Sequence, residues 1–242
     1  MTSEGGFINP ASTLAALPTV VVLVDGRILT QAADDGTGSS RLVPQVEVRD
    51  IGPSGVTAIL AAIRTAALDK AATGNPGIPG DSGTTVFTVV IDGVTTTTRL
   101  AAGGPPGPGG PGRSADPGRT AAFALLDRLL DLTDTWGAPA ATPAPYHPTA
   151  YRVYVAPDPA APDPSASPAP IAWPLSTDLA TFGTAAAPDR GIAGLRQGVV
   201  LGADAALLGP VVATAAAGTT FTSGGKGFTL YIRPLLPDEL GS

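Results

Sequence analysis

Runs of β-branched and aliphatic residues alternate along the chain with short polar turns, a pattern that predicts several strands. Two pairs of runs are separated only by an Asp-Gly dipeptide: residues 19–24 and 27–31 around Asp25-Gly26, and residues 85–91 and 94–100 around Asp92-Gly93. This dipeptide between apolar runs is typical of a type I′ turn, in which both central residues have positive φ. We therefore expect two β-hairpins. Further short strands are predicted at residues 46–49, 151–155, 198–201 and 228–233.

Three segments have the apolar spacing of an amphipathic helix: residues 53–68, 120–132 and 204–217. The first begins with Pro53, which suits a first helical turn. Its expected apolar face is Val56, Ile59, Leu60, Ile63, Ala67 and Leu68. The expected buried stripe of the second is Phe123, Leu126, Leu129 and Leu130. In the third, we expect Asp204 to be the N-cap and Pro210 to kink or shorten the helix.

Hairpins outnumber strand–helix–strand crossovers, so the predicted fold class is α+β, with a mainly antiparallel sheet and about three helices. Residues 23–26 resemble residues 90–93, which fits repeated strand–strand–helix units, although so short a match also arises by chance. We expect a flexible N-terminal arm at residues 1–17 and a single domain at 18–240. The 31 Gly and 26 Pro residues gather partly in two predicted loops, 101–118 and 138–170, so a two-lobe arrangement stays open.

The charge pattern argues against several functions. The net charge is −6, and the arginines are scattered, so the chain lacks the basic stripe that nucleic-acid binding needs. There is no cysteine, which excludes disulfides, thiolate catalysis and thiolate metal sites. No apolar run is long enough to span a bilayer, and the first six residues lack the features of a signal peptide. We expect no cofactor and no bound metal.

One short motif is suggestive of catalysis. Gly80-Asp81-Ser82-Gly83 resembles the nucleophile segment of chymotrypsin-like serine proteases, in which the serine attacks and backbone N–H groups stabilise the oxyanion. That family places its histidine before the serine. The one histidine of this chain, His147, follows Ser82 instead. Gly, Asp and Ser also form ordinary turns, so a turn is the favoured interpretation.

Two other patterns have simple explanations. Three carboxylates share one helical face by spacing, namely Asp127, Asp131 and Asp134. They fit a metal or acid–base pair, but a solvated polar face is the more common meaning of such spacing. Residues 224–227 contain Gly and Lys without the spacing of a phosphate loop, and their place before the last strand favours a hairpin turn.

Aromatic side chains flank the proline-rich loops and are the candidate binding residues: Trp136, Tyr146, His147, Tyr151 and Trp173. Aromatic rings beside prolines can line a groove for a sugar or a peptide. They also serve as core and loop-packing residues, which is the commoner role.

Four segments, at residues 23–30, 148–155, 173–183 and 233–239, resemble an uncharacterised group of proteins from high-GC bacteria. Many of that group look exported and lipoprotein-like, so the resemblance implies an extracellular or cell-envelope location and no activity. A cytoplasmic location stays open. We expect a non-enzymatic protein that binds an unknown small ligand or a protein partner. The alternatives are a hydrolase that uses Ser82 or carboxylates, and a structural or assembly module.

Overall fold

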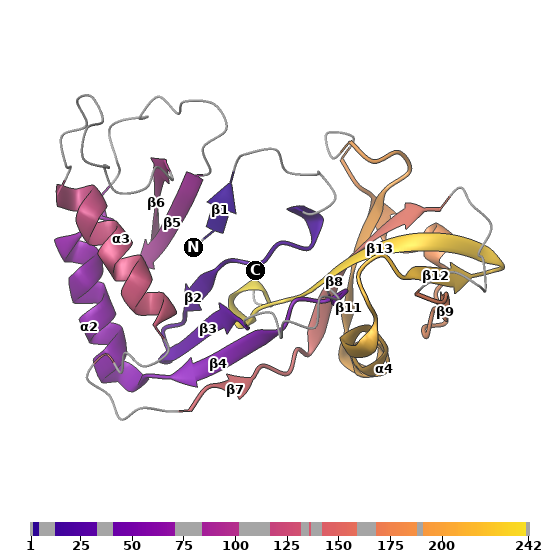
Figure 1. Cartoon of the computed structure of the whole chain (residues 1–242), viewed down its shortest axis with the longest axis horizontal. Helices are drawn as coiled ribbons and strands as arrows, with labels where there is room; N and C mark the ends of the chain where they lie inside the picture. The colour runs from indigo at the N-terminus through magenta and orange to yellow at the C-terminus, as the bar shows by residue number, and fades with distance from the viewer. Residues whose placement is uncertain are drawn as a thin grey trace. The chain divides into compact units, whose positions relative to one another are not determined.

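The computed structural model describes residues 2–4, 13–32, 41–70, 84–101, 117–131, 136, 142–158, 168–187 and 191–240. Within them the chain is an α+β protein with three α-helices and three mainly antiparallel sheets (Figure 1). It divides into two compact units. Unit 1 comprises Met1–Phe7, Pro18–Gln31 and Val46–Tyr146, and unit 2 comprises Ile8–Leu17, Ala32–Gln45 and His147–Ser242. Whether residues 18–240 fold as one domain stays a prediction.

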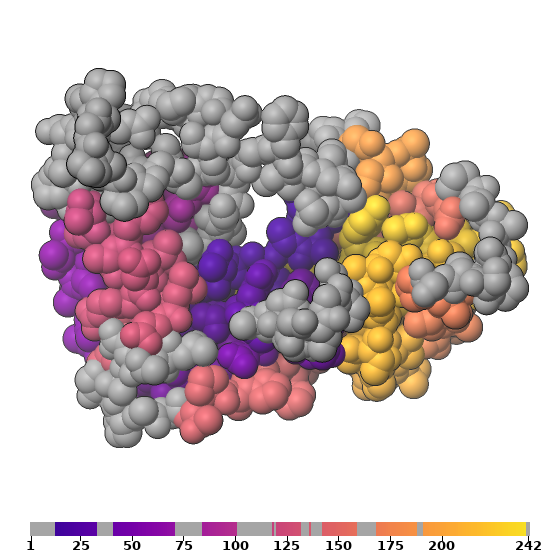
Figure 2. Space-filling view, in the orientation of Figure 1, coloured from indigo at the N-terminus to yellow at the C-terminus, as the bar shows by residue number. Residues whose placement is uncertain are grey.

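Unit 1 contains two antiparallel sheets and two helices. One sheet contains β2 (Val20–Val22), β3 (Arg27–Gln31), β4 (Val46–Asp50) and β7 (Ala144–Pro145). The other sheet contains β1 (Thr2–Glu4), β5 (Thr84–Ile91) and β6 (Val94–Ala101). The helices are α2 (Gly52–Thr65) and α3 (Pro117–Leu130). The helices lie side by side, and their outer faces form one exposed side of the unit (Figures 1 and 2). The core gathers side chains from both helices and both sheets, such as Ile28, Ile59, Phe87 and Leu125.

Unit 2 is built on one six-stranded sheet. Its order is β10 (Thr184–Ala185), β11 (Arg196–Leu201), β8 (Ala150–Pro157), β13 (Lys226–Pro234), β12 (Thr220–Ser223) and β9 (Ile171–Ala172), and only the β12–β9 pair is parallel. The helix α4 (Gly202–Thr214) packs its Leu208 and Val212 into the core on one face of this sheet. Short 3₁₀ turns lie at η1 (Leu179–Thr181) and η3 (Pro237–Glu239).

A single arginine fastens the loop around η1 to the sheet edge. Arg196 on β11 donates hydrogen bonds to the carbonyl oxygens of Thr181, Phe182 and Gly183, at 3.3, 2.8 and 2.8 Å. The Phe182 ring packs so closely against β11 that a Cβ atom on Gly198 would lie 2.6 Å from it. The charged side chain therefore supplies donors to loop carbonyl groups where the strand ladder ends.

The predicted strands are confirmed with small shifts of their ends. The buried face of helix α3, however, differs from the predicted one. On α3 the buried side chains are Ala122, Leu125 and Leu129, whereas Leu130 is 41% exposed. The prediction for Leu130 is therefore wrong, because the helix turns a neighbouring stripe toward the core. The buried Arg49 on β4 also donates to the carbonyl oxygen of Asp131, just beyond α3, at 3.2 Å. This bond ties the helix end to the sheet.

Helix α4 begins three residues earlier than predicted, with Leu201 at the N-cap position and no side-chain cap. The prediction of Asp204 as N-cap is wrong, since this residue lies inside the first turn. A carboxylate there still interacts favourably with the positive end of the helix. The helix continues past Pro210 to Thr214 because its apolar face is held in the core.

The two Asp-Gly turns differ. Asp92 and Gly93 have φ values of 52° and 76°, so the second hairpin has positive φ at both central residues, as predicted. In the first hairpin only Gly26 has positive φ, and its N–H donates to the carbonyl oxygen of Leu23. The prediction of a type I′ turn at Asp25-Gly26 is therefore wrong. The two hairpins lie in different sheets, and a repeated unit is not confirmed.

The close approach of Gly26 to the start of α2 explains the difference at the first turn. A Cβ atom on Gly26 would lie 2.8–2.9 Å from backbone atoms of Gly52. The carbonyl oxygen of Gly26 also accepts a hydrogen bond from the N–H of Ile51, at 2.8 Å. The hairpin is therefore shaped by its contact with the helix as well as by its own residues.

We predict that Gly26→Ala destabilises unit 1 by about 2–4 kcal/mol, because the new Cβ atom adds a steric clash to the strain of a positive φ. Gly93→Ala is the matched control, since Gly93 also has positive φ but has no atom within 4 Å of its Cβ position. It should cost only about 1–2 kcal/mol. Urea unfolding followed by circular dichroism measures both, and equal losses would contradict the close approach of Gly26 to Gly52.

Candidate functional site

The structure separates the five candidate binding residues between the two units. Trp136 and Tyr146 belong to unit 1, and His147, Tyr151 and Trp173 belong to unit 2. Trp136, Tyr151 and Trp173 are buried, at 3%, 5% and 8% exposure, whereas Tyr146 is half-buried and His147 is exposed. Tyr151 and Trp173 share the main core of unit 2.

The buried rings are held by contacts typical of cores. Trp173 packs edge-to-face against Phe182 and Phe221, with centroids 6.0 and 6.2 Å apart, and its Nε1 donates to the carbonyl oxygen of Thr177 at 3.0 Å. The guanidinium carbon of Arg128 lies 3.9 Å from the centre of the Trp136 ring, a cation–π contact. These rings stabilise their units, and their role in binding stays a prediction.

The candidate catalytic residues do not form a constellation that the structure describes. The segment with Ser82 lies outside the described residues. Asp127 and Asp131 are exposed, and Asp134 lies outside the described residues. In the described part of the chain, no three His, Asp or Glu side chains come together as a metal site would require. No helix there is both long and apolar enough to cross a bilayer.

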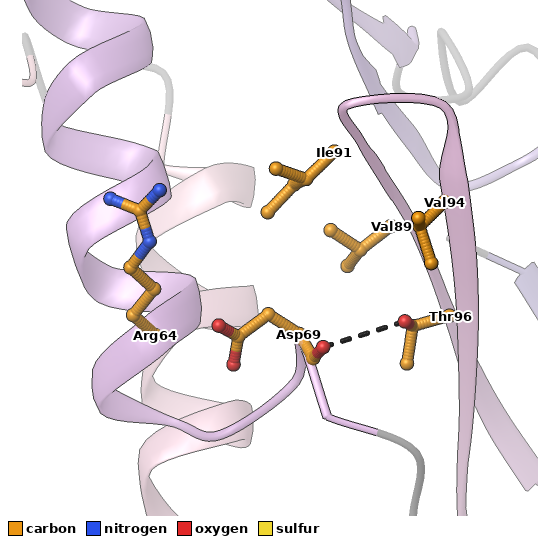
Figure 3. A pocket seen from close by; sticks show the side chains of 6 residues that line it. All are labelled: Arg64, Asp69, Val89, Ile91, Val94 and Thr96. Atoms are coloured by element: carbon orange, nitrogen blue, oxygen red, sulfur yellow. Dashed lines mark hydrogen bonds between the residues drawn. The ribbon is translucent and has the colours of Figure 1, made fainter.

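A small hollow lies in unit 1 among the described residues. It has a volume of about 200 Å³ and lies between the end of α2 and the hairpin of β5 and β6. Its lining consists of one guanidinium, one carboxylate, one hydroxyl and three aliphatic side chains, from Arg64, Asp69, Thr96, Val89, Ile91 and Val94 (Figure 3). None of these residues was among the candidates from the sequence.

The end of α2 places the two charged residues. Leu68 donates its N–H to the carbonyl oxygen of Ile63 and Ala67 donates to Arg64, the hydrogen-bond pattern of a Schellman motif. Ala67 is left-handed, with a φ of 54°, so the helix ends at Thr65 and the predicted continuation to residue 68 is wrong. The turn buries Leu68 and carries Asp69 toward the hairpin.

The hairpin supplies the other wall through two directly opposed residue pairs. Val89 faces Thr96 and Ile91 faces Val94, beside the Asp92-Gly93 turn. Thr96 also donates its hydroxyl to the backbone carbonyl oxygen of Asp69, at 3.4 Å. This bond, drawn in Figure 3, joins the hairpin to the turn after α2.

The two charged groups of the hollow do not pair with each other. One carboxylate oxygen of Asp69, Oδ1, is buried and accepts no hydrogen bond within the part of the chain that the structure describes. The side chain of Arg64 is exposed and forms no ion pair or hydrogen bond with the described residues. Figure 3 shows the Asp69 carboxylate extending toward α2, while the Arg64 guanidinium runs along the helix. Opposite charges therefore line one hollow, and each can accept a further partner.

Two charged side chains in unit 2, by contrast, form an ion pair with each other. Arg233 on β13 binds Glu239 in η3 through two hydrogen bonds, at 2.7 and 2.6 Å, and the N–H of Leu236 donates to the same carboxylate at 3.0 Å. Burial by itself would raise the pKa of Glu239. The hydrogen bonds from Arg233 and Leu236 together lower the pKa by a larger amount, so it lies below its usual value. This ion pair fastens the end of the chain to the sheet.

The fold and the hollow define an α+β protein with a small, mixed-charge concave site in one of its two units. No protein-family model, no curated protein and no solved structure matches the chain. The function must therefore be argued from the side chains of the site.

We predict that Ala67→Gly stabilises unit 1 by up to about 1 kcal/mol, because glycine relieves a left-handed strain of about 1–2 kcal/mol at a modest cost in chain entropy. Ala61→Gly, in the exposed middle of α2, is the control and should destabilise by about 1 kcal/mol. Urea unfolding separates the two. A loss for Ala67→Gly equal to that for Ala61→Gly would show that α2 does not end in this turn.

We predict that Glu239→Gln destabilises the protein by about 1–2 kcal/mol at neutral pH, because a partly buried, charge-assisted pair is lost. The folded-state pKa of Glu239 lies below that of an unfolded glutamate, about 4.3. Its contribution is therefore present above that pH and disappears as the pH falls through the lowered pKa.

The unfolding free energies of the wild-type protein and of Glu239→Gln, measured between pH 7 and pH 3, should therefore become more similar as the pH falls. Asp238→Asn is the control, since Asp238 is exposed and forms no hydrogen bond within the described residues. A difference between the wild-type protein and Glu239→Gln that does not change with pH would contradict the assigned pair.

Proposed function

We propose that the protein is a non-enzymatic ligand-binding protein and that the hollow of unit 1 is its binding site. The observation that carries the proposal is the buried, unpartnered Oδ1 atom of Asp69 in a concave surface that also contains Arg64. A buried carboxylate oxygen without a donor is costly, and a ligand that supplies an N–H or O–H group removes that cost.

The chemistry of the lining favours binding over catalysis. The Arg64 guanidinium presents N–H donors and no acceptor, and so it does not fit the role of a general base. Asp69 is the one carboxylate of the lining, whereas acid–base hydrolysis of a glycoside would use a facing pair. The remaining side chains can position and shield a ligand. The resemblance to an exported group supports a cell-envelope location as part of the same proposal.

We predict that a small charged ligand raises the melting temperature of the wild-type protein in a saturable way. At a concentration of about 100 Kd, the stabilisation is about 2.7 kcal/mol, since the ligand binds only the folded state. Asp69→Asn and Arg64→Gln should each abolish most of the shift. Calorimetric scans against a panel of divalent metals, glycans, lipids, short peptides and small charged metabolites measure it.

Arg99→Gln and Asp127→Asn are matched controls for the charge changes. Both residues are exposed in unit 1, and neither lines the hollow. Their variants should keep the full shift. A shift that survives in Asp69→Asn, or no shift with any compound, would contradict the assignment of the hollow.

A further inference from the structure

The size of the hollow limits what it can hold. A cavity of about 150 Å³ accommodates benzene, so the hollow of about 200 Å³ suits about eight non-hydrogen atoms. Sites for larger, drug-sized molecules are about 300–1,000 Å³. The space within the hollow therefore suits a small metabolite better than an oligomer or a nucleotide.

The charges of the hollow select the polarity of that metabolite. Arg64 favours an anionic group, which its planar guanidinium binds through two parallel N–H donors. Asp69 favours a cationic donor directed at its buried Oδ1 atom. A ligand with only one charge would satisfy one of these residues and be repelled by the other. A zwitterion satisfies both, and its zero net charge meets no long-range repulsion from a chain of net charge −6.

The hairpin wall specifies the rest of the ligand. Val89, Ile91 and Val94 present aliphatic carbon to the hollow, and Val94 is 66% exposed. A hydrocarbon group placed against these side chains would remove apolar surface from water on both partners. A purely polar zwitterion would leave that wall uncovered.

We infer that the hollow binds an α-amino acid with a branched aliphatic side chain. The α-ammonium group donates to Oδ1 of Asp69, the α-carboxylate accepts hydrogen bonds from Arg64, and the side chain packs against Val89, Ile91 and Val94. The inference rests on the proposed function, because it uses the same hollow and names its ligand.

Titration of the full-length chain with four compounds tests the three groups separately. L-leucine carries all of them, N-acetyl-L-leucine lacks the cation, L-leucinamide lacks the anion, and glycine lacks the side chain. Chemical-shift changes of the backbone amides of α2 and the hairpin give the dissociation constants. L-leucine should bind at least about tenfold more tightly than each of the other three, as one lost charged or apolar contact implies.

Variants assign each group to its residue. Asp69→Asn should weaken the binding of L-leucine and of L-leucinamide by at least about tenfold, because both carry the ammonium group. Arg64→Gln should weaken the binding of L-leucine but not of L-leucinamide, because L-leucinamide has no carboxylate to lose. Arg99→Gln should change neither dissociation constant. A variant that alters the circular dichroism spectrum is replaced by Asp69→Ser or Arg64→Ala, with the same expectations.

The outcomes separate this inference from the proposed function. If L-leucinamide binds as tightly as L-leucine and depends on Asp69, the hollow is an amine site: the zwitterion is wrong and the proposed function stands. If none of the four compounds binds but another panel compound depends on Asp69 and Arg64, the ligand class alone is wrong. If no compound depends on these residues, both are overturned.

Discussion

The left-handed turn at Ala67 is the constraint on which the candidate site depends. A helix that continued through residue 69 would carry Leu68 and Asp69 onward along its own axis. The chain instead accepts about 1–2 kcal/mol of backbone strain and buries Leu68 to 2% exposure. Full burial of a leucine is worth about 1.5–3 kcal/mol, so the apolar contact outweighs the strain. The turn then brings Asp69 beside the hairpin, where Thr96 holds its carbonyl oxygen.

Charged side chains differ in how completely their polar atoms are hydrogen-bonded. In unit 2, the buried Nε atom of Arg152 has no hydrogen-bond partner among the described residues, but Arg196 donates to three loop carbonyl groups and Arg233 pairs with Glu239. Such pairing is what a stable interior requires. In unit 1, the buried oxygen of Asp69 is left unsatisfied although the exposed guanidinium of Arg64 lines the same hollow. A polar atom that breaks the rule at a concave surface is a reason to look for a ligand there.

The aromatic side chains show why composition near a loop is a weak guide to a binding groove. Trp136, Tyr151 and Trp173 flank proline-rich segments, but each lies in a core. A buried aromatic ring removes a large apolar area from water and so contributes strongly to the stability of a core. A protein with only 5% aromatic residues therefore uses them for packing first.

Much of the fold was determined by the sequence alone, because strands and helices follow from local periodicity. The α+β class, the positions of the three helices and the positive φ values at Asp92-Gly93 could all be predicted in this way. Contacts between distant segments decided the rest. The close approach of Gly26 to Gly52 determines the first hairpin turn. Packing of α3 against its neighbours buries Leu125 and leaves Leu130 exposed. The hollow belongs to the same category: its hairpin pairs are local, but only tertiary packing brings them opposite the end of α2.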